Sequence, residues 1–235
     1  MKKGDLKKQE ILKTAETLFC RNGYETTSIQ DILDVLHTSK GSFYHHYASK
    51  ELLLEEICRV RASALSESIT ASLNENAPPM ENLNLLFTSM MPLTSEKLNF
   101  LIMLLPVFDL PEGRQIRFSY AESIRLFFHE KVLTEIKRAN ESGDLFCLNP
   151  VHSADMCFLI LNELWYQICL MILQNEKKDT DTDPADLLIM INNYRGTLER
   201  ILSAPYGSIR LLNLDDMKFL CDQIHYHLKL HQNNE

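Results

Sequence analysis

Glycine, proline and tryptophan are scarce in this sequence of 235 residues, which contains 7 Gly, 8 Pro and 1 Trp. Strand-type alternation of apolar and polar residues is hard to find, and apolar residues recur instead at helical spacing. Apolar residues make up 45% of the chain and charged residues 24%, an ordinary globular composition that argues against disorder. We therefore expect an all-α fold.

The six cysteines form no CxxC or other close pair, and most stand among apolar residues. Inert core thiols are therefore favoured over oxidant sensors. No apolar signal sequence opens the chain. The longest apolar stretch, Met156 to Leu173, is interrupted by Asn162, Glu163 and Gln167, which a lipid-facing helix would not carry without partners. These absences predict a cytoplasmic protein with no membrane partner.

Motifs that carry catalysis are also missing. The sequence has no nucleophile elbow, phosphate loop, HExxH or paired-carboxylate motif. Near the end of the chain stand His225, His227 and His231, but only the last two, four residues apart, share a helix face, and no Cys or carboxylate completes a metal set. A solvated surface is the favoured interpretation of these histidines. We expect neither an enzyme nor a metal or cofactor site.

The net charge of −8 is unevenly distributed along the chain. Residues 1–50 carry eight Lys/Arg and six Asp/Glu, whereas residues 51–235 carry sixteen and twenty-six. An acidic bulk repels nucleic acid, so the N-terminal face is the one that would approach phosphates. This asymmetry is weak support by itself, because short N-terminal segments are often mildly basic.

Two helices are predicted within the first 36 residues. The first runs from about residue 5 to 22, and Gly23 follows it in the position of a left-handed C-cap. The second begins near Thr27. Either Thr27 or Ser28 can cap it, since each has a capping-box partner three residues later, and both registers stay open.

A third short helix runs from its cap Ser39 to Tyr47, and a fourth, capped by Ser49, continues to about residue 73. The third helix buries little beyond Phe43 and Tyr47, and Gly41 inside it costs roughly 1 kcal/mol relative to Ala. A helix of this kind is best explained by contact with another molecule. A glycine also lets the backbone come close to a sugar–phosphate chain.

The remainder of the chain contains further helical stretches, separated by polar segments and prolines. Their predicted bounds are about 80–91, 95–108, 112–142, 151–175, 184–204 and 214–231.

The N-terminal pattern resembles the DNA-binding domain of TetR-family repressors over about residues 5–65, with a helix-turn-helix at about 28–47. The residues that carry the resemblance are Ile11, Leu12, Ala15, Leu18, Phe19, Gly23, Tyr24, Thr26, Thr27 and Ile32, then 39–47, Ser49, Lys50, Glu51 and Leu53. The family usually has Ala-Gly-Val before the third helix, where this chain has Leu36-His37-Thr38. Residues 66–235 resemble the family's helical-bundle ligand-binding and dimerisation domain in length and helix content.

The resemblance implies a DNA-binding transcriptional regulator, a repressor released from double-stranded operator DNA by a small molecule. The resemblance also implies that Lys50 binds a phosphate of the DNA backbone. The alternative for Lys50 is an ammonium group that simply lies in water. A helical regulator acting through a partner protein is the alternative function. The implied DNA-binding residues are Thr27, Ser28, Ser39, Lys40, Gly41, Ser42, Tyr44, His45, His46 and Lys50.

In the larger domain, the apolar stretch 156–173 and a second at 187–202 suit a homodimer interface, with a buried core helix as the alternative. An apolar pocket for an unidentified small apolar or amphipathic effector is expected by resemblance, although ordinary core packing is the simpler explanation of each residue. The candidate pocket residues are Phe100, Met103, Phe108, Phe118, Tyr120, Phe127, Trp165 and Tyr166.

Overall fold

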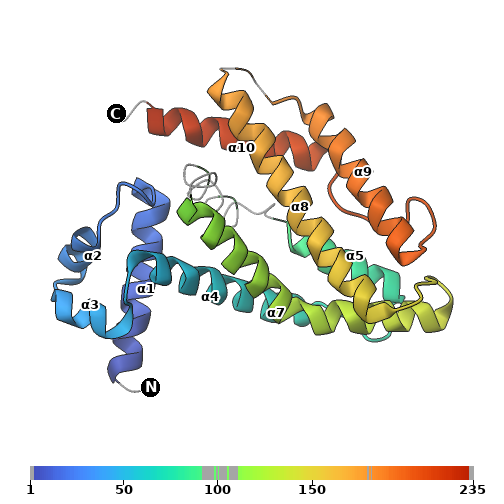
Figure 1. Ribbon diagram of the computed structural model, residues 1–235, viewed down its shortest axis with the longest axis horizontal. Coiled ribbons are helices and arrows are strands. Elements are labelled where there is room, and N and C mark those ends of the chain that lie inside the picture. The colour runs from blue at the N-terminus through green and yellow to red at the C-terminus, as the bar shows by residue number, and fades with distance from the viewer. Residues whose placement is uncertain are drawn as a thin grey trace. The chain divides into compact units, whose positions relative to one another are not determined.

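The computed structural model describes residues 3–91, 98, 100, 105, 111–178, 180 and 182–232, and within these ranges every regular element is helical (Figure 1). The all-α expectation is confirmed. The predicted helix at 95–108 lies almost entirely outside the described residues, and the other predicted bounds agree with the structure to within a few residues. The helices are α1 (Lys3–Asn22), α2 (Ile29–Leu36), α3 (Lys40–His46), α4 (Lys50–Thr70), α5 (Pro79–Ser89), α7 (Pro111–Ser142), α8 (Pro150–Lys177), α9 (Pro184–Leu202) and α10 (Leu214–Gln232).

The chain divides into two compact units. Unit 1 comprises residues 1–64 and 95–123, and unit 2 comprises residues 65–94 and 124–235. Helices α4 and α7 each begin in unit 1 and continue without interruption into unit 2. The domain ranges predicted from the sequence, 5–65 and 66–235, stay a prediction.

Unit 1 is built on one apolar core to which α1, α2, α3 and the first turns of α4 contribute. The apolar residues of α1 recur every four positions, at Ile11, Ala15 and Phe19, so they fall on one helix face and are fully buried. Phe100 and Ile116, which are distant in sequence, complete the same core. The three N-terminal helices are therefore held by residues from a much later part of the chain.

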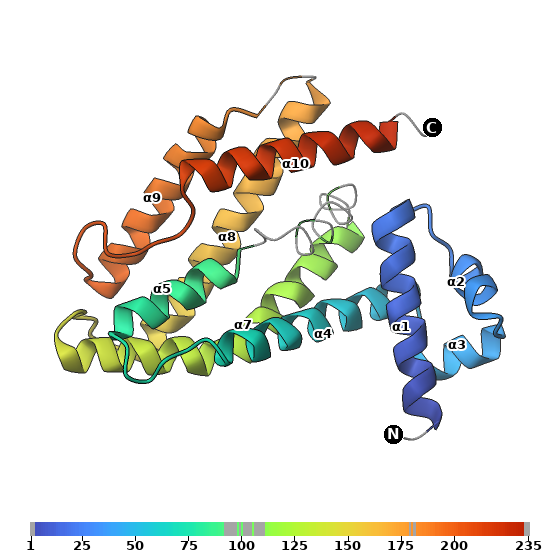
Figure 2. The ribbon, with the colours of Figure 1, turned by 180° about the vertical axis from the view of Figure 1, so that it is seen from behind.

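In unit 2, α9 packs against both α8 and α10 (Figures 1 and 2). The connection between α9 and α10 is fixed by Glu199, whose Oε1 accepts hydrogen bonds from the backbone N–H groups of Gly207 at 2.8 Å and Ile209 at 3.3 Å. Asn84 of α5 also holds this connection, because its side chain donates to the carbonyl of Ser208 and accepts from the N–H of Arg210.

The exposed faces of α8 and α9 are partly apolar. The side chains of Met156 and Leu159 in α8 and of Ile189 in α9 are each at least half exposed. By length and composition alone, the stretch Pro150–Asn175 of α8 is also apolar enough to cross a membrane. A core helix of a folded unit passes the same test, and α8 packs on α9, so this stretch is weak support for a membrane segment.

Candidate nucleic-acid interface

The turn after α1 has the geometry expected of a left-handed C-cap. Gly23 has φ of +92°, which favours glycine, and its N–H donates to the carbonyl of Phe19 at 2.9 Å. The ring of Tyr24 then packs edge-on against Phe19, with centroids 5.1 Å apart. The C-cap predicted at Gly23 is confirmed, and it directs the chain from α1 towards α2.

Ser28 caps α2, so the second of the two capping registers is the one used. Its hydroxyl accepts from the N–H of Asp31 at 3.1 Å, and Asp31 Oδ2 accepts from the N–H of Ser28 at 2.7 Å. The Ser28 hydroxyl also donates to Oδ2, and these side-chain and backbone hydrogen bonds lower the pKa of the Asp31 carboxyl. Thr27 points inward instead: its side chain is 1% exposed, and its hydroxyl donates to the carbonyl of Gly23 at 2.7 Å.

We expect Ser28→Ala to lower the free energy of unfolding by about 1 kcal/mol at neutral pH, because it removes the side-chain cap of α2. The lowered pKa of Asp31 means that its share of this stability is present above the ordinary carboxyl pKa and is lost as the pH falls through the lowered value. Urea denaturation of both proteins at several pH values measures this. A difference that grew towards acid pH would contradict the capping box.

The turn between α2 and α3 uses a left-handed residue that is not glycine. His37 has φ of +47° and ψ of +47°, and its N–H donates to the carbonyls of Asp34 and Leu33. The N–H of Thr38 also donates to Leu33. His37 therefore lies in the left-handed region, which histidine adopts more readily than most residues other than glycine.

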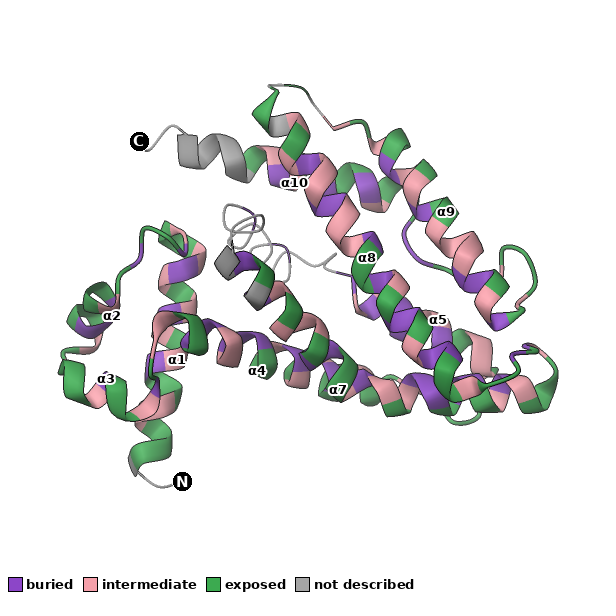
Figure 3. Cartoon of the chain, viewed as in Figure 1, coloured by how far each residue is buried: buried purple, intermediate pink, exposed green. Residues whose placement is uncertain are grey.

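Helix α3 is short and faces outward on most of its surface (Figure 3). Ser39 caps it by accepting from the N–H of Ser42. Phe43 is fully buried and Tyr47 nearly so, and desolvation by burial raises the pKa of the Tyr47 hydroxyl to about 12. A Cβ built at Gly41 would meet nothing nearer than Ser39 Oγ at 3.8 Å, so packing inside the protein does not require glycine there.

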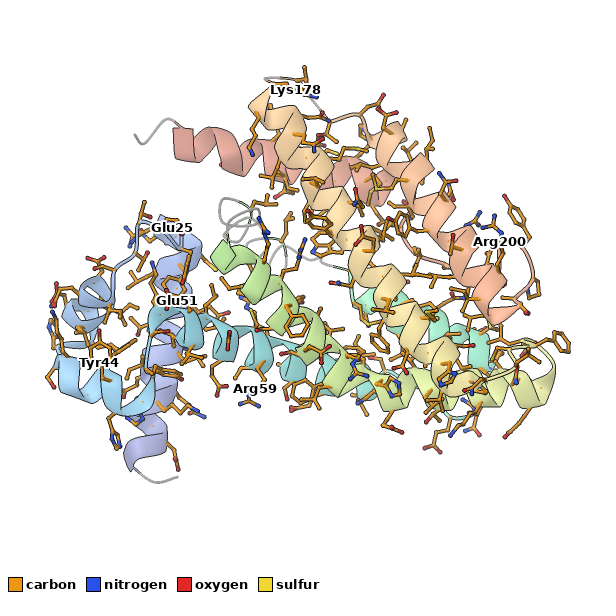
Figure 4. All side chains as sticks on the ribbon, viewed as in Figure 1. Glu25, Tyr44, Glu51, Arg59, Lys178 and Arg200 are labelled. Atoms are coloured by element: carbon orange, nitrogen blue, oxygen red, sulfur yellow. The ribbon has the colours of Figure 1, made fainter. Side chains whose placement is uncertain are left out.

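The side chains on the outward face of α3 and at the start of α2 form a surface that we name the α2–α3 surface. Tyr44, 53% exposed, marks it in Figure 4. Two of the ten predicted DNA-binding residues, Thr27 and Lys50, direct their polar side-chain atoms at backbone carbonyls of the α1–α2 turn. The other eight, which define the surface, are Ser28, Ser39, Lys40, Gly41, Ser42, Tyr44, His45 and His46.

Lys50 lies at the first turn of α4 and reaches back to the α1–α2 turn. Its Nζ donates to the carbonyls of Tyr24 at 3.0 Å and Thr27 at 3.2 Å, and it stands 4.2 Å from the centroid of the Tyr24 ring. The Tyr24 hydroxyl in turn contacts Glu51 Oε1 at 3.5 Å, and a hydrogen bond with the Ser49 side chain is the main cause that lowers the pKa of Glu51. Sequence reasoning missed these contacts.

Sequence reasoning also missed Val35, which is exposed at the end of α2 next to the turn. A signal was present: Val35 lies outside the buried face of α2, which holds Ile32 and Leu33. A single exposed apolar side chain is normal on a protein surface, so Val35 by itself indicates no contact.

Six of the eight predicted pocket residues lie among the described residues, and the pocket itself stays a prediction. Phe100 belongs to the unit 1 core, where the guanidinium of Arg61 lies 4.5 Å from its ring, and Tyr120 packs against the same core. Phe118 is exposed, whereas Phe127, Trp165 and Tyr166 are half-buried. Met103 and Phe108 lie outside the described residues.

A cavity of about 240 Å³ lies elsewhere in unit 2, and none of the predicted pocket residues lines it. It is formed by the end of α8, the segment before α9 and one face of α10. Its lining residues are Ile172, Thr182, Pro184, Cys221, Asp222, Ile224 and His225.

No group of three His, Cys, Asp or Glu side chains suited to a metal ion occurs among the described residues. The six cysteines form no disulfide with one another. Burial raises the pKa of the Cys157 thiol to about 12 and that of Cys221 to about 11, and it also raises that of Cys58. Thiols held in the protonated form are poor nucleophiles, which supports the interpretation of inert core cysteines.

Comparison with known proteins adds an independent observation. Residues 11–57 match the model of the family described as bacterial regulatory proteins, tetR family. The chain is 32% identical over 114 residues to the uncharacterized HTH-type transcriptional regulator YerO of Bacillus subtilis. This alignment covers 47% of this chain and 39% of YerO. The chain is also 35% identical over 81 residues to the HTH-type transcriptional repressor KstR2 of Mycolicibacterium smegmatis. This second alignment covers 34% of this chain and 40% of KstR2.

These matches span about two fifths of the length of the curated relatives. Over nearly the whole chain, the fold is similar to that of RolR in complex with resorcinol, with a TM-score of 0.58 at 11% identity, covering 93% of this chain and 94% of RolR. The matched family segment coincides with the helices that carry the α2–α3 surface. Residues 11–57 therefore match the tetR family of bacterial regulatory proteins, and the chain as a whole has a fold similar to that of RolR.

Proposed function

We propose that this protein is a cytoplasmic transcriptional repressor that binds operator DNA as a homodimer and leaves it when a small molecule binds to unit 2. In each subunit, α3 enters the major groove, and the α2–α3 surface contacts the bases and the sugar–phosphate backbone. The name of the similar repressor KstR2 supports the direction of regulation. The resorcinol complex of RolR, which has a similar fold, supports a small effector.

One observation carries the proposal: α3 exposes most of its polar and aromatic side chains and is anchored by Phe43 and Tyr47. A seven-residue helix that contains a glycine is intrinsically weak. Its outward residues combine hydrogen-bond donors with a cation at Lys40, which are the groups that bind DNA bases and phosphates. Duplex DNA is therefore the partner that this helix fits best.

Fluorescence anisotropy with DNA from upstream of the protein's own gene tests the proposal. A tight site that outcompetes unrelated DNA, with an affinity that falls steeply as salt rises, is the expected result. A flat salt response with no preferred sequence would favour a regulator that acts through a partner protein.

Gly41→Ala is expected to change stability and DNA binding in opposite directions. The added methyl group meets only Ser39 Oγ, at the ordinary van der Waals distance of 3.8 Å, and improves helix propensity, so the free energy of unfolding should rise by up to about 1 kcal/mol. Operator affinity should fall, because the methyl group stands where the backbone approaches DNA. Urea denaturation and anisotropy titration of the same preparation measure the two effects. Unchanged affinity in the stabilised variant would remove Gly41 from the interface.

The release step requires that a change in unit 2 reaches the α2–α3 surface. Two continuous helices, α4 and α7, run from one unit into the other. Because Ile116 of α7 belongs to the unit 1 core, the start of α7 is fixed to the DNA-binding helices together with α4. We therefore expect an effector to displace α4 and α7 jointly, and not α4 alone, and to alter the separation of the two α3 helices in the dimer.

A further inference from the structure

We propose that the cavity between the end of α8, the segment before α9 and one face of α10 is a binding site for a small organic cation. We call it the α8–α10 site; its lining residues are those given above. The charged group of the ligand lies at Asp222, and its hydrocarbon part lies on the buried apolar lining. The inference goes beyond the proposed function, because binding at this site requires no DNA.

The inner lining of the α8–α10 site is apolar. Ile172 and Ile224 are almost fully buried, and Pro184 and Cys221 add further apolar surface. Water makes few hydrogen bonds on such a lining, whereas hydrocarbon that packs against it is removed from water. The volume of about 240 Å³ is smaller than the roughly 300–1,000 Å³ of most ligand pockets, so the ligand has about the size of a single ring.

The wall formed by the segment before α9 is held in place by hydrogen bonds within unit 2. Asn175 Nδ2 donates to Thr182 Oγ1 at 3.1 Å, and the carbonyl of Asn175 accepts from the N–H of Thr180 at 3.0 Å. The side chain of Asp183 caps α9 by accepting from the N–H of Ala185 at 2.8 Å. Because the ligand does not have to order this wall, the entropic cost of binding is reduced.

The charged part of the lining is acidic. Asp222 lines the cavity and is exposed to solvent, and the lining residues that the structure describes include no lysine or arginine. Burial raises the pKa of the Cys221 thiol to about 11, and the negative charges of Asp222 and Asp183 raise it further. A potential that opposes a thiolate at this position favours a cation.

An exposed carboxylate by itself attracts a cation only weakly, because water and salt screen the charge. The α8–α10 site places such a carboxylate next to a buried apolar lining, so a ligand with both a charge and a hydrocarbon part gains from both. An inorganic cation would gain only the screened attraction. The site therefore selects an organic cation.

Four small probes test the class of ligand when each is titrated into the full chain and followed by NMR. Cyclohexylamine, which is a cation at neutral pH, should bind at least about tenfold more tightly than cyclohexanol, and also than methylamine, which lacks the ring. Cyclohexanecarboxylate, with the opposite charge, should bind more weakly than cyclohexanol. Equal affinities for cyclohexylamine and cyclohexanol, tighter binding of the carboxylate, or no binding of cyclohexylamine would each overturn the proposal.

Asp222→Asn removes the charge and keeps the shape of the side chain. We expect it to weaken binding of cyclohexylamine about tenfold and to leave binding of cyclohexanol unchanged. Asp215→Asn is the matched control, because Asp215 also lies on α10, about 10 Å away along the helix axis, and does not line the cavity. The control should bind both probes as the unaltered protein does. Equal weakening by both substitutions would indicate a general attraction of cations to an acidic protein, and would overturn the site.

Backbone amide chemical shifts locate the bound probe without a substitution. Cyclohexylamine should shift the amides of Thr182 and of residues 221–225 in a saturable manner and leave those of α2 unchanged. Shifts that do not saturate, or that saturate only elsewhere, would refute the site. No DNA is present in these titrations, so they do not bear on the proposed function. A protein that binds the cation at this site but binds no operator would refute the proposed function alone.

Discussion

We expect Phe43→Ala to lower the free energy of unfolding of unit 1 by about 3–5 kcal/mol and to abolish specific DNA binding. The Phe43 side chain is 0% exposed and is one of the two aromatic anchors of α3, together with Tyr47, whose ring centroid lies 6.1 Å away. Removing the larger part of a buried aromatic leaves a cavity against α1, α2 and α4. A helix of seven residues is not stable by itself, so its intrinsic helix propensity cannot offset the lost packing.

The measurement has to report on unit 1 by itself. Trp165 is the one tryptophan of the sequence and lies in α8, so tryptophan fluorescence follows unit 2. Hydrogen exchange of residues 11–57 across a urea series follows unit 1 instead. The expected result is an earlier transition in this segment with little change in the Trp165 transition. A variant with unchanged protection and unchanged DNA affinity would show that Phe43 does not hold α3.

The neighbouring residue is the matched control for this substitution. Tyr44 packs edge-on against Phe43, with ring centroids 5.4 Å apart, but it is 53% exposed. Tyr44→Ala should therefore cost about 1 kcal/mol of stability, the value of an aromatic pair, while it weakens operator binding. A large loss of stability in Phe43→Ala, against weakened binding with little loss of stability in Tyr44→Ala, distinguishes the anchor of α3 from its contact surface.

The sequence predicted best those features that depend on residues close to one another in the chain. The C-cap at Gly23 and the N-caps at Ser39 and Ser49 involve contacts over three or four residues, and the helical period places the buried face of α1. The capping register of α2 stayed open because Thr27 and Ser28 both satisfy the local rule. Burial decides between them, and burial is a property of the folded unit.

The features that sequence reasoning missed depend on distant contacts. Lys50 meets carbonyls 26 and 23 residues away, and no side-chain pattern encodes a backbone oxygen as its partner. For Phe100 both a ligand pocket and ordinary core packing were open, because spacing alone does not distinguish an aromatic in a pocket from one in a core. Its place against Arg61 and the unit 1 core follows from the path of the chain, which spacing does not reveal.

Leu159→Glu is expected to convert the proposed dimer into monomers and to reduce operator affinity by at least about a hundredfold. Leu159 is 64% exposed on α8, three residues from Met156, and Ile189 is exposed on α9; both helices contain the stretches expected to form the interface. In a two-fold symmetric interface each substitution occurs twice, so two carboxylates would be buried without partners. The paired recognition helices would be lost, and each α3 would bind its half-site alone.

Sedimentation equilibrium gives the oligomeric state, and anisotropy on the same samples gives the operator affinity. Leu126→Glu is the matched control, because Leu126 is 70% exposed on α7, outside the expected interface helices, and this variant should remain dimeric and bind normally. If Leu159→Glu stayed dimeric with unchanged affinity, the exposed apolar residues of α8 would not be the dimer interface. If both variants dissociated, the interface would extend to α7, since only a surface that includes both leucines would respond to either charge.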